Sequence, residues 1–245
     1  MCALGTSGGR PAPGYPRAMT TAAVVLGAGR GKRLGAEIPK AFVPLRGIPL
    51  MLRSLRVLDT VPAIDLIVPV VGTADRERYG CMALEGLVKV GNAVTGGALR
   101  QDSMAAGVAA LPASTEWVAV HDAARCLVDV ADVGAVIAAA RESGAAILAE
   151  RVRDTIKRVR GGRIVETPDR SECWAAQTPQ VFRYDLLREA IEKAGAEGWH
   201  GTDDAELVER MGVPVRVVES QAPNPKITLA EDLAQADRWL AREDG

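Results

Sequence analysis

The chain has few of the residues on which several common kinds of active site depend. Only two of its 245 residues are histidines, His121 and His200, and this disfavours a zinc site or a Ser-His-Asp triad. Its four cysteines are scattered without C-x-x-C spacing, a pattern that favours free thiols in a reducing cytoplasm. The chemistry of this protein is therefore expected to depend on other groups.

Long apolar runs and a strong excess of charge are also lacking. No stretch of about 18 apolar residues exists that could span a bilayer. The formal net charge is −1, which argues against electrostatic binding to nucleic acid or to an anionic membrane. With 48% hydrophobic residues, the chain can nevertheless bury a full core. We expect a cytoplasmic protein that binds neither nucleic acid nor membrane.

The first 18 residues differ in composition from the rest of the chain. They are rich in Gly, Pro and Arg and lack an apolar signal segment. We expect a disordered tail over 1–18 and a single domain over 19–245. The favoured interpretation is that Met19 is the true first residue, and the alternative is a transit peptide.

Short apolar runs alternate with helical patterns over most of the chain. The runs are continuous, as expected for strands that helices cover on both faces. They lie at 22–26, 64–71, 88–95, 117–121, 145–150 and 215–219. Helical patterns lie near 50–58, 74–87, 101–111, 130–143 and 184–194. This order predicts an α/β fold with a doubly wound, mostly parallel, Rossmann-like sheet.

Residues 152–172 form a charged segment of another kind. Apolar residues alternate there around Gly161 and Gly162, which predicts a β-hairpin. We expect a projecting arm that meets a second copy of the chain. The alternative is a hairpin that is simply solvated at the surface.

The strand at 22–26 runs into a glycine-rich, cationic turn that suits phosphate. Glycines let backbone N–H groups approach a phosphate, and Arg and Lys supply the counter-charge. The turn contains Gly27, Ala28, Gly29, Arg30, Gly31 and Arg33, with Lys40 shortly after it. It is not a dinucleotide fingerprint, because Lys32 stands where the third glycine belongs, and Arg33 breaks the P-loop pattern.

Two more loops at predicted strand ends carry polar chemistry. In one, Gly96 and Gly97 precede Ser103; in the other, over 121–125, Asp122 ends a strand and can meet a metal-bound phosphate. Ligands of doubly wound sheets bind at the carboxyl ends of the strands, so we expect all three loops to meet at one crevice. The alternative for each is an ordinary turn, a helix-start residue or a local ion pair.

The motifs follow the order found in a known family. The chain resembles the 2-C-methyl-D-erythritol 4-phosphate cytidylyltransferases through AAVVLGAGRGKRLG, GGALRQDS, VHDAAR, VRDTIK, ETPDR, QTPQVF, TDDAELVE and NPKIT. The resemblance covers about residues 22–240 and implies a nucleotidyltransferase fold. It also implies transfer of CMP from CTP to 2-C-methyl-D-erythritol 4-phosphate, with release of pyrophosphate, in isoprenoid precursor synthesis. One departure is Ala98, which stands where the family often has a polar residue.

The resemblance implies roles for individual residues. Expected to be catalytic are Arg33, Lys40, Arg170 and Lys226. Expected to bind the nucleotide are Gly27, Ala28, Gly29, Arg30, Gly31, Gly96, Gly97, Ser103 and Ala123. Expected to bind the acceptor are Asp122, Arg125, Thr155, Arg170, Thr178, Thr202 and Lys226.

A cofactor and an assembly are implied in the same way. Mg²⁺ is expected to bridge the phosphates, with Asp122 nearby, directly or through water. The arm is expected to make a homodimer in which it reaches the active site of the other copy. The nearest alternative is ribitol-5-phosphate cytidylyltransferase, which performs the same chemistry on another acceptor. A remote alternative is a non-catalytic nucleotide-binding protein, which has no need for cations around the reacting phosphorus.

Overall fold

The computed structural model describes residues 21–29 and 38–243. The expected tail over 1–18 lies outside these ranges, and so do Arg30, Gly31 and Arg33 of the cationic turn.

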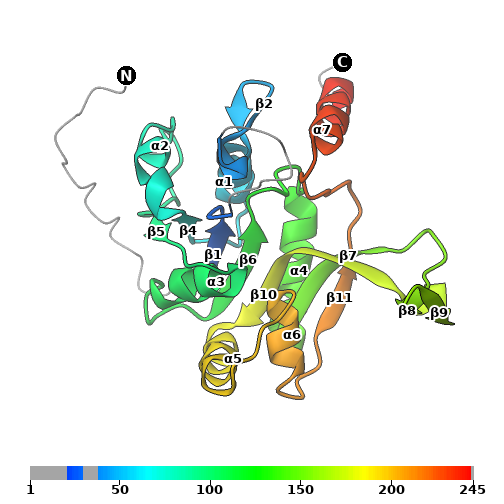
Figure 1. Cartoon of the computed structure of the whole chain (residues 1–245). Coiled ribbons are helices and arrows are strands. Elements are labelled where there is room, and N and C mark those ends of the chain that lie inside the picture. The colour runs from blue at the N-terminus through cyan, green and yellow to red at the C-terminus, as the bar shows by residue number, and fades with distance from the viewer. Residues whose placement is uncertain (1–20, 30–37, 244–245) are drawn as a thin grey trace.

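Among the described residues, seven strands form one central sheet (Figure 1). They are β1 (Thr21–Leu26), β4 (Leu66–Val71), β5 (Val94–Thr95), β6 (Trp117–Asp122), β7 (Ala145–Arg151), β10 (Trp174–Arg183) and β11 (Arg216–Glu219). Their spatial order is β11-β7-β10-β6-β1-β4-β5. All neighbours are parallel except β10, which runs antiparallel to both β6 and β7. The predicted mostly parallel sheet is confirmed.

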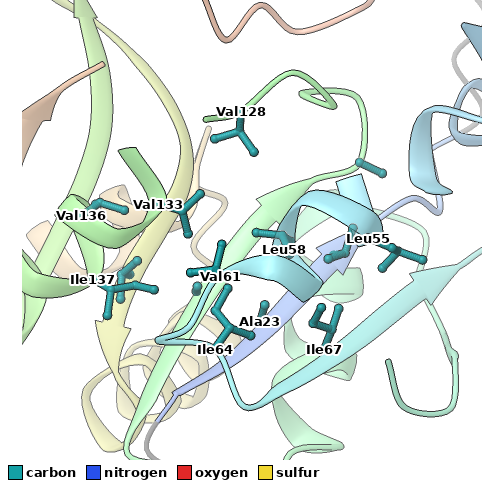
Figure 2. Close-up of a cluster of buried hydrophobic side chains, with 14 of the residues drawn as sticks. Ala23, Leu55, Leu58, Val61, Ile64, Ile67, Val128, Val133, Val136 and Ile137 are labelled. Atoms are coloured by element: carbon teal, nitrogen blue, oxygen red, sulfur yellow. The ribbon is translucent and has the colours of Figure 1, made fainter. Parts of the chain in front are cut away.

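Helices cover both faces of the sheet. One face carries α1 (Leu50–Thr60) and α4 (Val130–Ser143), and the other carries α3 (Arg100–Ala109) and α5 (Tyr184–Glu197). Alternate residues of β1 belong to the two cores. Ala23 packs with Leu55, Leu58 and Ile137 (Figure 2), whereas its neighbour Val24 belongs to the opposite cluster. This double burial explains why the strand reads as a continuous apolar run.

Two predicted elements are shorter than expected, and one strand of the central sheet was not predicted. The helix expected at 74–87 is only α2 (Arg76–Gly80), and the strand expected at 88–95 is reduced to β5. No strand was predicted over β10, because Pro179 interrupts the pattern and cannot donate to a ladder. It is accommodated where the β7–β10 register shifts, between Ala176 and Gln180.

The C-terminal helix packs against a small hairpin. This hairpin consists of β2 (Pro44–Leu45) and β3 (Ile48–Pro49). Leu45 shares a third buried cluster with Ile227 and with Ala236 of α7 (Ala230–Glu243). The short helix α6 (Asp204–Glu209) packs instead in the cluster of α3 and α5.

The predicted hairpin is present as β8 (Arg158–Arg160) and β9 (Arg163–Glu166). Gly161 and Gly162 connect its strands with positive φ angles of 56° and 73°, as a tight hairpin turn requires. Every strand residue of the hairpin is exposed, and it extends away from the main sheet (Figure 1).

The cysteines only partly follow expectation. Cys126 and Cys173 are free thiols, but Cys81 is disulfide-bonded, so the expectation of free thiols is wrong for this residue.

None of the helices in the described ranges has the length and apolar character needed to cross a membrane.

Candidate active site

The site begins at the carboxyl ends of β1 and β6. These strands are neighbours in register, with Leu26 opposite Asp122, and the Ala123 N–H donates to the Leu26 carbonyl at 3.0 Å. The chain leaves β1 towards β4 on one side and later returns to β6 on the other. Loops that leave in opposite directions open a crevice between them, which is where ligands bind in sheets of this kind.

A cavity of about 270 Å³ occupies this crevice. The loop after β1, the loop before α3 and the end of β6 all contribute to its wall, so the three predicted loops meet as expected. Predicted nucleotide-binding residues that line it are Gly27, Ala28, Gly29, Gly97, Ser103 and Ala123. Lys40 and Lys226 line it as well.

Two glycines pack closely beside this cavity. A Cβ atom on Gly27 would meet the Cε end of the flexible Met51 side chain, which would have to shift. A Cβ atom on Gly96 would lie 2.6 Å from both the Ala28 Cβ and the Ser103 Oγ. Gly96 therefore lets the loop before α3 rest directly against the loop after β1.

A second cavity, of about 220 Å³, adjoins the first. It is lined by Arg125, Thr178 and Thr202, all predicted to bind the acceptor, and by Gln177, Gln180 and Asp203. Three residues line both cavities: Arg100, Asp122 and Lys226. A group attached to a ligand in one cavity can therefore meet a ligand in the other at this shared wall.

The shared wall is a network of alternating charges. Arg100 Nε lies 3.1 Å from Asp122 Oδ1, and Lys226 Nζ lies 2.6 Å from Asp122 Oδ2, so both cations form ion pairs with this carboxylate. Burial by itself would raise the pKa of Asp122, but Arg100 and Lys226 more than offset this and hold it well below its usual range. Asp122 is therefore a carboxylate at neutral pH, and Lys226 remains 39% exposed towards the cavities.

Arg100 is fixed from its other end by a fully buried carboxylate. Its Nη1 and Nη2 donate to the two oxygens of Asp204 at 2.7 and 2.8 Å. This two-pronged geometry is the strongest kind of Arg–carboxylate contact. Both residues lie within the motifs GGALRQDS and TDDAELVE, but the sequence predicted a role for neither, because 104 positions separate them and only the fold brings them together.

Asp122 is also held through its backbone. Its N–H donates to Thr178 Oγ1 at 3.0 Å, and the same oxygen lies 3.1 Å from His121 Nδ1. His121 is completely buried, and this burial lowers its pKa to about 4, so the ring is neutral at physiological pH. Thr178 is only 4% exposed, and its hydroxyl is fixed by these contacts to Asp122 and His121.

Two residues predicted to bind the acceptor, Thr155 and Arg170, belong to the arm and not to the two cavities of this single chain. Arg170 is exposed and donates to the Arg153 carbonyl at 2.8 Å, and Thr155 is exposed as well. In the described part of one chain, neither lines either cavity. Their assignment to the acceptor stays a prediction.

No preformed cage for a metal ion exists in the described ranges, where no three His, Cys, Asp or Glu side chains form a possible metal-binding group. Asp122 presents a carboxylate to both cavities, and each of its oxygens keeps a second lone pair beside the contacts to Arg100 and Lys226. Magnesium commonly binds through one or two carboxylates together with substrate phosphates and water. The donor set therefore fits a magnesium ion that arrives with a phosphate ligand.

Comparison with known proteins agrees with this geometry. The chain is 45% identical over 224 residues to a 2-C-methyl-D-erythritol 4-phosphate cytidylyltransferase of Geobacillus kaustophilus, covering 91% of this chain and 98% of the relative. It is 44% identical over 222 residues to one of Symbiobacterium thermophilum, covering 90% and 92%.

Solved structures are similar as well. A 4-diphosphocytidyl-2C-methyl-D-erythritol synthase of Anaerococcus prevotii aligns with a TM-score of 0.82 at 28% identity, covering 91% of this chain and 96% of the other. A 2-C-methyl-D-erythritol 4-phosphate cytidylyltransferase of Thermus thermophilus aligns at 0.73 and 33% identity, covering 90% and 98%. The model of the IspD family, 2-C-methyl-D-erythritol 4-phosphate cytidylyltransferase, matches residues 21–242, and the chain belongs to this family.

Proposed function

We propose that this protein transfers CMP from CTP to 2-C-methyl-D-erythritol 4-phosphate, forming 4-diphosphocytidyl-2-C-methyl-D-erythritol and pyrophosphate for isoprenoid precursor synthesis. Family membership supports the reaction. The observation that carries it is the pair of adjoining cavities that share Arg100, Asp122 and Lys226. A reaction between two phosphates needs two adjoining sites with cations where they meet.

In this proposal the first cavity receives CTP. The backbone of Gly27 to Gly29 cradles the triphosphate, helped by Arg30 and Gly31, and Lys40 supplies positive charge. Gly96, Gly97, Ser103 and Ala123 surround the cytosine and ribose. Small residues leave room for a pyrimidine, and the buried polar groups penalise a base that cannot pair with them.

The second cavity receives the acceptor phosphate. Asp122, Arg125, Thr178 and Thr202 surround the acceptor, and Lys226 lies at the boundary with the first cavity. A phosphate arriving there meets Lys226, whose present partner is Asp122. The same lysine can therefore orient the incoming oxygen against the α-phosphorus of CTP.

The chemical step is an in-line displacement. An oxygen of the acceptor phosphate forms a bond to the α-phosphorus, and the bond from that phosphorus to the bridging oxygen of the β-phosphate breaks. The electron pair of the broken bond leaves with pyrophosphate. Arg33, Lys40 and Lys226 stabilise the charge that accumulates on the phosphate oxygens, with Arg170 supplied by the arm. No covalent enzyme intermediate is required.

We propose Mg²⁺ as the divalent cation, with Asp122 as the carboxylate nearest to it. When bound, the ion would neutralise phosphate charge. The protein's part is to keep Asp122 ionised, which the contacts from Arg100 and Lys226 do.

We further propose that the protein works as a homodimer through its arm. Within one chain, the described cavities lack Thr155 and Arg170, whereas the arm carries exposed apolar side chains, with Val159 55% and Ile164 63% exposed. Contact with a second copy would bury this surface and bring Arg170 to the other copy's acceptor. We also propose one folded domain over 19–245.

Location in the cytoplasm is proposed on chemical grounds. The cytoplasm supplies CTP, the nucleotide substrate of the proposed reaction. No nucleic-acid or membrane partner forms part of the proposal.

The test is release of pyrophosphate in the presence of magnesium. CTP is offered with 2-C-methyl-D-erythritol 4-phosphate or with D-ribitol 5-phosphate, and UTP and ATP replace CTP in parallel reactions. We expect turnover with CTP and the erythritol phosphate, slower turnover with UTP and almost none with ATP. A higher kcat/KM for ribitol 5-phosphate would show that the acceptor is wrong, and inactivity with both acceptors would refute the enzyme assignment.

A further inference from the structure

His121 has no part in the mechanism above, yet it contacts Thr178, which lines the acceptor cavity. It lies at the end of β6, where its neighbours Ala119 and Val120 are fully buried apolar residues. The His121 ring is equally buried. A polar ring in such a position costs free energy unless a hydrogen bond compensates for its burial. Its partner is Thr178 Oγ1, which lies 3.1 Å from Nδ1.

The contact lies where the backbone ladder between β6 and β10 ends. The last paired residues are Val120 and Gln180, and Pro179 follows on the β10 side without an N–H to donate. Beyond this point the Asp122 N–H donates to the Thr178 hydroxyl instead, at 3.0 Å. One side-chain oxygen thus continues the ladder to the residue that carries the central carboxylate.

A hydroxyl that continues a ladder must be held in one rotamer. Thr178 Oγ1 has two neighbours in the described structure, the Asp122 N–H and the His121 Nδ1. The other ring nitrogen, Nε2, makes no hydrogen bond within the described residues. Only the Nδ1 side of the ring therefore anchors the hydroxyl.

We propose that His121 is a positioning residue of the acceptor site, which through Nδ1 holds the Thr178 hydroxyl and so fixes the end of β6 at Asp122. This inference rests on the proposed function and deepens it. It assigns to a side chain that touches neither substrate the task of keeping the wall of the acceptor cavity in place.

Two substitutions separate this role from simple packing. The side-chain amide of Asn reaches the position of Nδ1, whereas that of Gln reaches the position of Nε2. We expect His121→Asn to keep the acceptor KM within about twofold and His121→Gln to raise it about fivefold, as for one lost buried hydrogen bond. The KM for CTP should stay constant in both. A packing role predicts the reverse order, because Gln is nearer to His in volume, and that order or equal values would overturn the inference.

A second pair tests the path through Thr178. Thr178→Val removes the hydroxyl at constant shape, and Thr178→Ser restores it; we expect the first to raise the acceptor KM far more than the second. The double variant His121→Gln/Thr178→Val should be no worse than Thr178→Val alone, because the two residues act through one contact. If the two changes multiply their effects on the acceptor KM in the double variant, the inference is wrong. Melting temperatures are measured for every variant. If His121→Gln is poorly folded, His121→Ala replaces it, and the double variant His121→Ala/Thr178→Val is compared with Thr178→Val alone in the same way.

The wild-type protein is the control that distinguishes a failure of the proposed function from a failure of the inference about His121. If it fails to join CTP to the erythritol phosphate, the proposed function falls and this inference falls with it. If it reacts but His121→Asn and His121→Gln behave alike, the inference alone is wrong.

Discussion

Lys226 and Asp122 form an ion pair at the wall between the two cavities, with Nζ 2.6 Å from Oδ2. Arg100 occupies the other oxygen of Asp122 and is itself anchored by Asp204. Lys226 is thus the more exposed cation of this network, at 39% against 29% for Arg100. An arriving phosphate can take Lys226 as a partner while Arg100 still holds Asp122 in place.

Lys226→Ala should lower kcat/KM by about a hundredfold to a thousandfold, because a preorganised cation at the reacting phosphates is lost. Steady-state kinetics with both substrates measures this. Lys193→Ala, an exposed lysine on α5 that lies in neither cavity, is the matched control and should retain full activity. Comparable kinetics for the two variants would remove Lys226 from the mechanism.

Asp204→Asn should destabilise the fold by roughly 3 kcal/mol, because it removes the buried carboxylate that holds both Nη atoms of Arg100 and leaves Asp122 as the partner of Nε alone. Urea unfolding measures the change in the free energy of unfolding. The control is Glu192→Gln, which breaks the exposed pair with Arg188 on α5 and should cost less than about 0.5 kcal/mol. Equal losses would show that the buried pair adds nothing beyond a surface contact.

Gly96→Ala should raise the KM for CTP, because the new Cβ would lie 2.6 Å from both Ala28 Cβ and Ser103 Oγ and would push the two loops apart. Gly195→Ala on α5 is the control, since a Cβ there meets nothing within 4 Å. We expect Gly195→Ala to leave kinetics unchanged and to raise the melting temperature slightly, as alanine favours a helix interior. An unchanged CTP KM in Gly96→Ala would argue against this pocket.

Cys126 should resist alkylation in the folded protein at pH 8. It is 2% exposed, and burial raises the pKa of its thiol to about 11, so little reactive thiolate exists. Cys173 is partly exposed and should be labelled under the same conditions. Peptide mass mapping before and after urea treatment distinguishes the two residues. Rapid native labelling of Cys126 would mean that its cluster with Leu45 and Ile227 opens readily.

The shared-site arrangement predicts complementation between two inactive variants. Lys40→Ala and Arg170→Ala homodimers should each be nearly inactive if every site takes Lys40 from one chain and Arg170 from the other. In a mixed dimer, one site then carries both changes and the other carries none. Refolding equal amounts together should restore about a quarter of the original activity, because half the dimers are mixed and half of their sites are intact. No recovery, with mixed dimers verified by mass, would place both residues in one chain's site.

Much of the fold and of the first cavity could be predicted from local patterns. The helix predicted at 130–143 has those bounds in the structure, where Asp129 caps its start and Gly144 follows its end. The loops around Gly27, Gly97 and Asp122 were placed together because parallel strands present their carboxyl ends on one edge. These predictions succeed because apolar runs and glycines report on local conformation and burial.

The sequence by itself determined most of the order of strands and helices, the three loops that meet at the first cavity and the hairpin around Gly161. Only the tertiary structure decided that β10 inserts antiparallel between β6 and β7, which brings Thr178 to Asp122, and that Asp204 clamps Arg100. Such pairings join residues 56 and 104 positions apart. They depend on the free energy of a whole sheet and its buried polar groups, and no local pattern encodes that sum.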